Sequence, residues 1–359
     1  MGICEATRRY EAWLARAVPL VRADLRLKHE LMAADSLSFL RATFYRWAEL
    51  WPDGCRRLAG APAVLAVGDL HIENFGTWRD AEGRLIWGVN DFDETVTLPY
   101  TQDLVRLATS ALLAIEGAQL ALSIRATCTS ILEGYAESLG RGGGPAVLAE
   151  HYRWLRDLAI ARLKDQRPFW QRLEALPDAT RGHHHARGLL QAALPPQVVP
   201  RFVQRQAGAG SLGRVRLVAL ADWRGGMIAR EAKPLAPSAW LWARRRRLRP
   251  PRYAELTTRA MRVPDPFLKV HGKWLIRRLA PDSSRIELPS LPRNREEDRL
   301  LWMMGWETAN MHLATRSQVP RILADLRQRK RNWLARAAGR MAQAVERDWR
   351  KWRKGYASD

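Results

Sequence analysis

Cysteine is scarce in this sequence, and long apolar runs are missing from it. Three cysteines occur among 359 residues, widely spaced and without a CxxC pair, at Cys4, Cys55 and Cys128. This pattern gives neither a disulfide framework nor a zinc site, and it is typical of a reducing compartment. No run of about 18 apolar residues occurs, and the N-terminal stretch lacks the pattern of a signal peptide. We therefore expect a cytoplasmic protein with no transmembrane segment.

Acidic residues are few relative to basic ones. The chain has 37 Asp and Glu against 59 Lys and Arg, which gives a formal net charge of +22. Much of the excess lies in two arginine-rich segments, Arg244–Arg252 and Arg327–Arg353. Such a surface attracts polyanions, so contact with nucleic acid, acidic membrane or a phosphorylated substrate is open. A GC-rich genome would enrich arginine without any such partner.

The apolar pattern divides the chain into a helical part and a strand-rich part. Hydrophobic residues make up 47% of a chain with 16 tryptophans, which indicates a globular protein whose length suits two domains or lobes. Helical spacing runs through the first fifty residues, with Asp35 as a predicted cap, and again over 102–138, 146–175 and from Glu296 onward. Strand patterns lie at Ala63–Val67, Phe75–Trp78, Leu85–Val89, Phe202–Ala207, Arg214–Ala221, Met227–Lys233, Phe267–Val270 and Trp274–Leu279. The second and third of these predict a hairpin with Gly83 in its turn.

One loop carries residues suited to phosphoryl transfer. Gly68–Phe75 reads GDLHIENF after the predicted strand at Ala63–Val67, and Asn74 follows Asp69 by five residues. This matches the D-L-x-x-x-N spacing of the kinase catalytic loop, in which the Asp orients the acceptor hydroxyl and the Asn holds Mg²⁺. Asp91, after the predicted hairpin, stands where the metal-binding Asp of the D-F-G segment would. Asp69 and Asn74 could instead make turn hydrogen bonds.

A second pattern, far along the chain, is suited to binding phosphate. Gly208, Gly210, Ser211 and Gly213 form G-x-G-S-x-G-x-V between two predicted strands. Glycines let backbone N–H groups approach phosphates, because they permit unusual backbone angles and carry no side chain. A strand follows, where a dinucleotide-binding fold would need a helix. Lys233, on the next strand, lies where a kinase holds its phosphate-binding lysine.

Together the two patterns supply nearly every polar part of a kinase site, but in reversed order. Glu255, on the helical stretch after Lys233, is a candidate partner for that lysine or else a solvated surface residue. In ordinary kinases the glycine loop and lysine precede the catalytic Asp, whereas here they follow it by roughly 140 residues. A circular permutation would explain this order, provided that the termini lie close together. Gly68–Asn74 must then face Gly208–Gly213 across a cleft.

The first pattern resembles the GDLHxxN loop of aminoglycoside phosphotransferases and their choline-kinase and homoserine-kinase relatives. In those enzymes an I-D-W/F segment and a D-L-A motif follow; here Val89–Asp93 reads VNDFD, and Asp103 opens DLVRLA. The resemblance implies that Asp103 supports the catalytic loop and that His71 is structural. Asp93, two residues beyond Asp91, could reach the same metal or be a surface carboxylate.

The reversed order resembles the bacterial domain-of-unknown-function 2252 family. That family's S-x-x-F-L/F-R segment, G-D-x-H-x-x-N-F-G loop, N-D-F-D-E segment and G-x-G-S-x-G loop have counterparts within residues 25–316. Two departures stand out. The family's V-K-E-A strand reads Arg-Glu-Ala-Lys233 here, and its late A-H-A-R-S-G motif becomes Met311–Arg316. The resemblance implies a kinase-like fold and names no substrate.

We therefore expect an α+β chain with a two-lobed protein-kinase-like fold, circularly permuted, in which a mostly helical catalytic lobe precedes a small antiparallel β lobe. The expected division is a catalytic lobe at 1–175, a linker at 176–200, a nucleotide-binding lobe at 201–290, and C-terminal helices with a basic tail at 291–359.

The expected activity is ATP- and Mg²⁺-dependent phosphoryl transfer to an unknown acceptor, for which the GDLH loop favours a small molecule. Two alternatives stay open. One is transfer of the nucleotidyl (AMP) group on the same fold. The other is a non-catalytic, pseudokinase-like binder of nucleic acid or acidic lipid that uses the basic surface.

Overall fold

The computed structural model describes residues 2–117, 122–161, 165–283 and 296–356, and over these residues the chain is a mixed α+β protein. Helices predominate, and the strands described form three small sheets in which every pairing between strands is antiparallel. The α+β class predicted from the sequence is confirmed. None of the helices described is long and apolar enough to cross a membrane.

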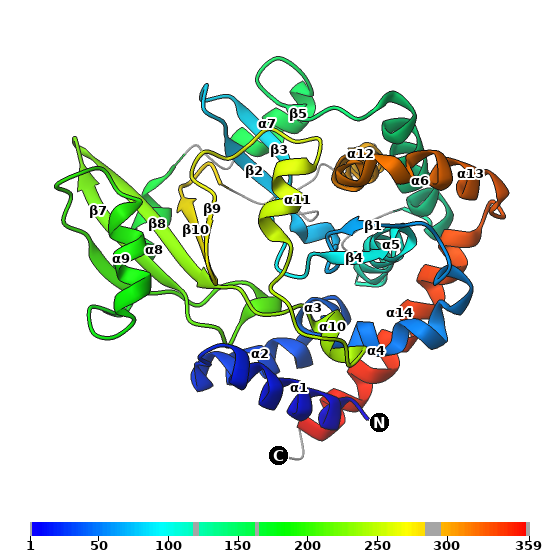
Figure 1. Cartoon of the computed structure of the whole chain (residues 1–359), viewed down its shortest axis with the longest axis horizontal. Helices are drawn as coiled ribbons and strands as arrows, with labels where there is room; N and C mark the ends of the chain where they lie inside the picture. Colours follow the sequence, from blue (N-terminus) through cyan, green and yellow to red (C-terminus); the bar gives the residue numbers. More distant parts are fainter. Residues whose placement is uncertain (1, 118–121, 162–164, 284–295, 357–359) are drawn as a thin grey trace.

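The helical part is assembled from both ends of the chain. Its helices are α1 (Ile3–Ala17), α2 (Arg22–Ala34), α3 (Ser36–Ala42), α4 (Phe44–Gly54), α5 (Tyr100–Glu116), α6 (Ile124–Arg141), α12 (Glu296–His312), α13 (Val319–Gln328) and α14 (Trp333–Tyr356). The C-terminal α14 packs against α5, α2 and α4, so one hydrophobic core holds residues from Ile3 to Trp352. The two termini lie side by side (Figure 1), and a Cβ added at Gly355 would lie 3.2 Å from Cys4 Sγ.

Helices α6 and α12 make the closest helix contact of this core, because each has a glycine where the other's backbone passes. A Cβ added at Gly134 would collide with the carbonyl of Trp302, and one added at Gly305 would collide with the carbonyl of Ile131. The missing side chains therefore let the two backbones touch.

Local sequence signals set several element boundaries in this part. Asp35 caps α3 as predicted, because its Oδ1 accepts a hydrogen bond from the Ser38 N–H at 2.8 Å. The single helical pattern predicted over 102–138 is instead two helices. α5 ends at Glu116, just before Gly117, and α6 begins after Ser123, whose hydroxyl accepts a hydrogen bond from the Ala126 N–H at 3.2 Å. A glycine and a capping serine thus override the continuous apolar spacing.

The strand-rich part is a five-stranded sheet with order β6-β7-β8-β10-β9. Its strands are β6 (Arg201–Gln204), β7 (Leu217–Trp223), β8 (Gly226–Pro234), β9 (Lys269–His271) and β10 (Trp274–Leu279). Side chains alternate between the two faces, as the period of a strand requires. Leu217 and Ala232 face α9 (His184–Ala192), whereas Val218 and Leu220 face α8 (Arg167–Glu174). Both helices lie beside this sheet at the left of Figure 1.

The predicted linker at 176–200 includes a helical segment that the sequence pattern did not indicate. This stretch contains α9, whose Ala186 and Leu190 are fully buried against the sheet. The surrounding histidines and prolines obscured a short apolar stripe with helical spacing.

Two smaller sheets join the helical part to the sheet of five strands. In the first, β1 (Ala63–Ala66) pairs with β4 (Val96–Pro99). In the second, β2 (Phe75–Arg79) pairs with β3 (Leu85–Val89), and β3 pairs with β5 (Ala146–Val147). The predicted hairpin is confirmed, and Gly83 in its turn has φ +74°. Shorter elements complete the chain: η1 (Arg56–Leu58), η2 (Ile72–Asn74), α7 (Arg153–Ala161), η3 (Ala209–Ser211), α10 (Ala239–Ala243), α11 (Tyr253–Arg259) and η5 (Leu313–Gln318).

Candidate functional site

The GDLHIEN loop connects β1 to β2 and contains η2, and its first residues are held by Asp103, in the first turn of α5. The Asp103 carboxylate accepts hydrogen bonds from the N–H groups of Val67 at 2.7 Å and Gly68 at 2.9 Å. Gly68 has φ +88°, and a Cβ there would lie 2.5 Å from the Glu94 carbonyl oxygen. The loop conformation therefore requires glycine at this position. The structure gives Asp103 the supporting position that the resemblance implied.

Two residues that the sequence did not single out extend this support. His312 Nε2 lies 3.1 Å from Asp103 Oδ2, and the Tyr135 hydroxyl lies 2.8 Å from His312 Nδ1. All three side chains are fully buried. Through these contacts the GDLHIEN loop is connected to α12 and α6. Because the residues concerned are far apart in the sequence, no local pattern indicates that they meet.

Asp69, the candidate catalytic residue, is paired with Arg106. Arg106 Nε donates to Asp69 Oδ1 at 2.6 Å, and the guanidinium lies 5.0 Å from the ring centres of both Phe44 and Trp47. Burial raises the pKa of Asp69 to about 6, although the positive charge of Arg106 acts to lower it. Asp69 is therefore ionised at neutral pH but close to its titration range. Arg106 had a sequence signal that was not used, a charged residue within an apolar helix.

His71 and Asn74 shape the same loop. His71 Nδ1 accepts a hydrogen bond from the Glu73 N–H at 3.2 Å, and the Asn74 amide donates to the Asp69 backbone carbonyl. Glu73 also pairs with Arg41 at 2.8 Å. The turn hydrogen bonds considered for Asn74 are thus present, and Asn74 in addition lines the cleft described next.

The glycine loop faces the GDLHIEN loop, as their motifs require. A single pocket is lined by Asp69, His71 and Asn74 on one side and by Gly208, Gly210 and Ser211 on the other, with Arg41, Val67, Asp91, Asp93, Glu94 and Arg214 around them. We call this pocket the cleft.

Gly210 lies close to both α3 and the GDLHIEN loop. A Cβ added there would lie 2.9 Å from the Arg41 carbonyl oxygen and 3.5 Å from Asp69 Oδ2. Gly208 and Gly213 have φ values of +76° and +95°, which favour glycine. Ser211 accepts a hydrogen bond from Arg216.

The N-terminal helices hold the far side of the glycine loop. Leu20 forms a β-bridge with Arg214, and the Val21 N–H donates to the Gly213 carbonyl at 2.8 Å. Gln206 donates to Asp24 at 2.7 Å. These contacts fix the glycine loop against the same body that carries Asp69.

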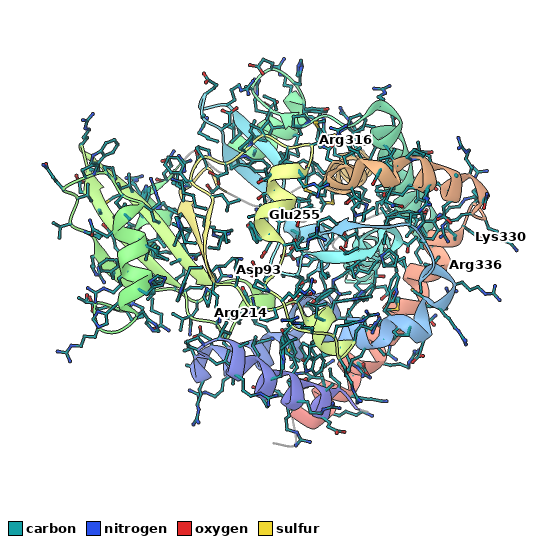
Figure 2. The ribbon with its side chains drawn as sticks, in the orientation of Figure 1. Asp93, Arg214, Glu255, Arg316, Lys330 and Arg336 are labelled. Atoms are coloured by element: carbon teal, nitrogen blue, oxygen red, sulfur yellow. The ribbon has the colours of Figure 1, made fainter. Side chains whose placement is uncertain are left out.

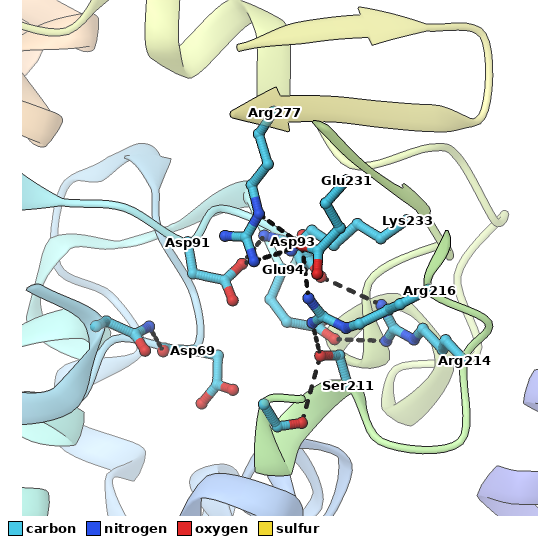
Figure 3. A network of polar contacts seen from close by, with 12 residues as sticks. Asp69, Asp91, Asp93, Glu94, Ser211, Arg214, Arg216, Glu231, Lys233 and Arg277 are labelled. Carbon is cyan, nitrogen blue, oxygen red and sulfur yellow. Dashed lines mark hydrogen bonds and ion pairs between the residues drawn. The ribbon is translucent and has the colours of Figure 1, made fainter. Parts of the chain in front are cut away.

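Lys233 connects the sheet to the acidic side of the cleft (Figure 3). Its Nζ lies 2.7 Å from Asp93 Oδ1 and 3.3 Å from Asp91 Oδ1. Burial acts to raise the pKa of Asp91, but the positive charges of Lys233 and Arg277 bring it below the ordinary value. Asp91 is therefore ionised at neutral pH, and its side chain is 33% exposed. Asp93 is buried, so the surface-carboxylate interpretation of Asp93 is wrong.

The predicted pairing of Glu255 with Lys233 is also wrong. Glu255 pairs instead with Arg252, just before α11, at 2.5 Å and with Arg259, at the end of α11, at 2.9 Å. The surface-residue interpretation of Glu255 is the one that fits these contacts, because arginines at helical spacing are the nearer partners.

The carboxylate that sequence reasoning missed is Glu231, two residues before Lys233 on β8. It is fully buried and pairs with Arg205 at 2.7 Å, Arg216 at 3.1 Å and Arg277 at 2.5 Å. Burial opposes its ionisation, but the three guanidinium groups hold the pKa of Glu231 well below its ordinary value. The spacing was an available signal, because residues two apart on a strand share a face.

The three arginines also line a second, larger cavity of about 630 Å³ next to the cleft. Asp91 and Gly208 line both spaces, so the cavity and the cleft adjoin at these residues. Three guanidinium groups around one carboxylate leave an excess of positive charge in this wall. Arg216 also has a buried Nε–H without a hydrogen-bond partner among the described residues. Such a wall suits an anionic ligand.

Glu94 closes the cleft on the side of α10. Its Oε2 accepts from the Ala239 N–H at 2.7 Å, and its Oε1 lies 3.9 Å from Arg214. Burial raises the pKa of Glu94 to about 8, against the lowering effect of Arg214. Glu94 is therefore largely protonated at neutral pH.

Within the described ranges, no group of three or more His, Cys, Asp or Glu side chains is placed to hold a metal ion by itself. The candidate ligands Asn74, Asp91 and Asp93 all line the cleft. A magnesium ion carried by nucleotide phosphates needs only one or two carboxylates from the protein. Asp91 fits that need, because it is ionised and partly exposed.

Comparison with known proteins gives one family match. Residues 20–194 match the family model DUF2252, described as an uncharacterized protein conserved in bacteria. This supports the predicted relationship to that family over the part of the chain that holds the GDLHIEN loop. Neither the curated proteins nor the solved structures compared with the chain gave a match.

Proposed function

We propose that this chain is a phosphotransferase that uses a nucleoside triphosphate, with a two-lobed, circularly permuted kinase-like fold. The observation that carries the proposal is the meeting of the two loops at one cleft. Asp69 of the GDLHIEN loop lies opposite Gly210 of the glycine loop, and Lys233 reaches Asp91 between them. Two patterns about 140 residues apart in sequence thus supply one set of groups suited to phosphoryl transfer.

The proposed permutation is supported by the arrangement of the termini. The N-terminal α1 contacts the C-terminal α14, so a chain joined there and opened elsewhere would keep the same core. Lys233 lies on the third strand of its sheet in chain order, and the glycine loop joins the first two, as in kinases. Starting from β6, the parts follow the kinase order of glycine loop, lysine and catalytic loop.

In this proposal each residue has a chemical role. Asp69, ionised at neutral pH, would orient the acceptor hydroxyl and take its proton as the new phosphorus–oxygen bond forms and the bond to the leaving diphosphate breaks. The backbone of Gly208–Gly213 and the ammonium of Lys233 would hold the phosphates. Asp91, with Asn74 beside it, would hold a magnesium ion that neutralises charge on those phosphates. The acceptor is a small molecule in this proposal.

Nucleotidyl transfer is the second candidate, and the arginine wall around Glu231 favours it. Arg205, Arg216 and Arg277 offer positive charge on the side of Asp91 away from Asp69. If the β and γ phosphates of a nucleoside triphosphate bound to these arginines, its α phosphate would lie nearest the GDLHIEN loop. Incubation with ATP labelled at the α or the γ position separates the two reactions, because only the transferred group carries its label to the acceptor.

The first experiment is a thermal-shift series with nucleotides, with and without Mg²⁺. We expect a nucleoside triphosphate to raise the melting temperature by several degrees, because a ligand that binds only the folded state stabilises it. Asp91→Asn should remove the part of the shift that depends on Mg²⁺. Glu255→Gln is the matched control, because among the described residues Glu255 pairs with Arg252 and Arg259 and does not line the cleft. If no nucleotide shifts the wild-type protein, the proposal is wrong.

A further inference from the structure

Another cavity, lined mostly by apolar residues, lies beside α1 and apart from the cleft. It has a volume of about 450 Å³, within the range of pockets that bind small ligands. Its lining residues are Trp13, Arg16, Ala17, Leu235, Pro237, Leu248, Arg249, Pro250 and Lys273. No residue of the cleft contributes to it, and no Asp or Glu lines it.

The floor of this cavity is formed by buried side chains, whereas one wall is exposed. Trp13 is 8% exposed and packs against Tyr10 with ring centres 5.3 Å apart. Leu235 is buried, and its N–H donates to the Lys273 carbonyl at 2.8 Å. Leu248, in the loop after α10, is 44% exposed. The aliphatic side chain of Leu248 is thus exposed to solvent next to an apolar cavity.

Unpaired cations surround Leu248. Arg16, Arg249 and Lys273 line the cavity, and Arg245 and Arg246 line an adjoining pocket that shares Trp13 and Leu248. All five are exposed, and none has an ion-pair partner in the part of the chain that the structure describes. At the cleft, in contrast, Arg41 pairs with Glu73, Arg214 lies near Asp93 and Glu94, and Lys233 pairs with Asp91 and Asp93. We call Leu248 and these five cations the Leu248 surface.

We propose that the Leu248 surface binds acidic phospholipid at a membrane. The cations would contact the lipid headgroups, and Leu248 would insert at the boundary between the headgroups and the acyl chains. The cavity would enclose part of a lipid acyl chain. The combination of an exposed aliphatic residue with flanking basic residues is the composition of interfacial segments. Single-stranded nucleic acid would instead need exposed aromatic rings for base stacking, and Trp13 lies at the floor of the cavity with little surface open.

The test is co-sedimentation of the full chain with vesicles at about physiological ionic strength. Vesicles of phosphatidylcholine containing one third phosphatidylserine should bind the protein, and vesicles of phosphatidylcholine alone should not. Each charge removed should weaken binding roughly fivefold, so the combined variant Arg245→Gln, Arg246→Gln and Arg249→Gln should lose about two orders of magnitude. Leu248→Ser should weaken binding without changing its dependence on salt.

The matched control removes the same number of charges from another surface. Lys330, Arg331 and Arg336 lie at the start of α14 and just before it, and Lys330 and Arg336 are at the right of Figure 2. Changing these three to Gln should leave vesicle binding intact, and the melting temperature of every variant shows whether it is folded. Equal losses in both combined variants would overturn the proposal, because overall charge would then be sufficient.

Two further binding experiments distinguish a membrane from other ligands of the Leu248 surface. Dodecyl phosphate below its micelle concentration supplies the same head and chain without a bilayer. If it binds at micromolar concentration and vesicles do not, the cavity takes a free amphiphile and the membrane proposal is wrong. A single-stranded oligonucleotide that binds more tightly than the acidic vesicles, and that loses this affinity in the Arg245→Gln, Arg246→Gln and Arg249→Gln variant, would also overturn it.

Discussion

Arg106 holds the carboxylate of Asp69 from inside the helical core. The Arg106 side chain is fully buried, and its Nε donates to Asp69 Oδ1 at 2.6 Å, while its guanidinium also donates to the Leu40 carbonyl at 2.9 Å. The candidate catalytic carboxylate is thus fixed in place by a residue that no ligand can reach. A buried charge of this kind is costly unless its partner stays ionised.

Arg106→Met should therefore destabilise the protein and change how Asp69 titrates. Removing one partner of a buried ion pair costs about 3–5 kcal/mol, and without the guanidinium the pKa of Asp69 should rise further above 6. In the proposed function Asp69 must be ionised to orient the acceptor, so the acid limb of the activity profile should move to higher pH. Urea unfolding and rate measurements against pH check both effects.

Two variants sharpen this test. Adding Asp69→Asn to Arg106→Met should recover part of the lost stability, because the buried charge is then gone. Arg141→Met removes an exposed partner of Glu137 and should change the free energy of unfolding very little. If Arg106→Met is as mild as Arg141→Met, the buried pair does not support the loop.

Gly210→Ala should weaken nucleotide binding with little loss of stability. The added Cβ would lie 2.9 Å from the carbonyl oxygen of Arg41 in α3, so the glycine loop must move away from α3, and with it from the cleft that both line. We expect the nucleotide dissociation constant to rise at least tenfold, roughly 1.4 kcal/mol, measured by calorimetry. Gly226→Ala is the control in the same sheet, because a Cβ there meets nothing within 4 Å. Equal affinities for the two variants would mean that the close approach is not needed.

The parts of the structure that the sequence predicted are those with local signals. The hairpin with Gly83, the cap at Asp35 and the strand that carries Lys233 all follow from short-range patterns. α9 was missed, because its apolar stripe is short and lies between histidines and prolines.

The residues of the candidate site can also be divided into those with a local sequence signal and those without one. The two loops were predicted from their motifs, and their meeting followed from the kinase comparison. The partners of Asp103 and Glu231 were not predicted, because a pattern along the chain does not show which distant side chains meet in space. Glu255 was chosen for its place on a helix after Lys233, whereas the buried acid is Glu231 on the strand itself.

The stability of the protein should fall with rising pH through the titration of Glu307. Burial raises the pKa of Glu307 to about 8 from an ordinary value near 4.5, and Asn310 donates to its Oε1 at 2.6 Å. Between these two pH values the unfolded chain has released the proton and the folded chain still binds it. The folded state therefore binds more protons, and its stability declines as pH rises across this window.

Glu307→Gln should remove this component of the pH dependence. The variant and the wild type should be similar in stability near pH 5, and the variant should be more stable by a few kcal/mol, on the order of the linkage value, near pH 8.5. Urea unfolding at intervals between these values measures the difference. Glu137→Gln, at an exposed carboxylate, should show no such divergence. A constant difference between Glu307→Gln and wild type would contradict the assigned titration.

Lys233 should be required both for stability and for nucleotide binding, and the two requirements can be separated. Its side chain is 3% exposed, and its ammonium lies between the carboxylates of Asp91 and Asp93. Lys233→Met leaves both carboxylates without this cation, so we expect a loss of about 3–5 kcal/mol and a rise in the pKa of Asp91 toward its ordinary value. Adding Asp93→Asn to Lys233→Met should restore part of the stability, because one of the two carboxylates is then neutral. Nucleotide affinity should stay low in the double variant, since the phosphates would still lack the ammonium. If affinity returns together with stability, Lys233 serves only to neutralise the two carboxylates.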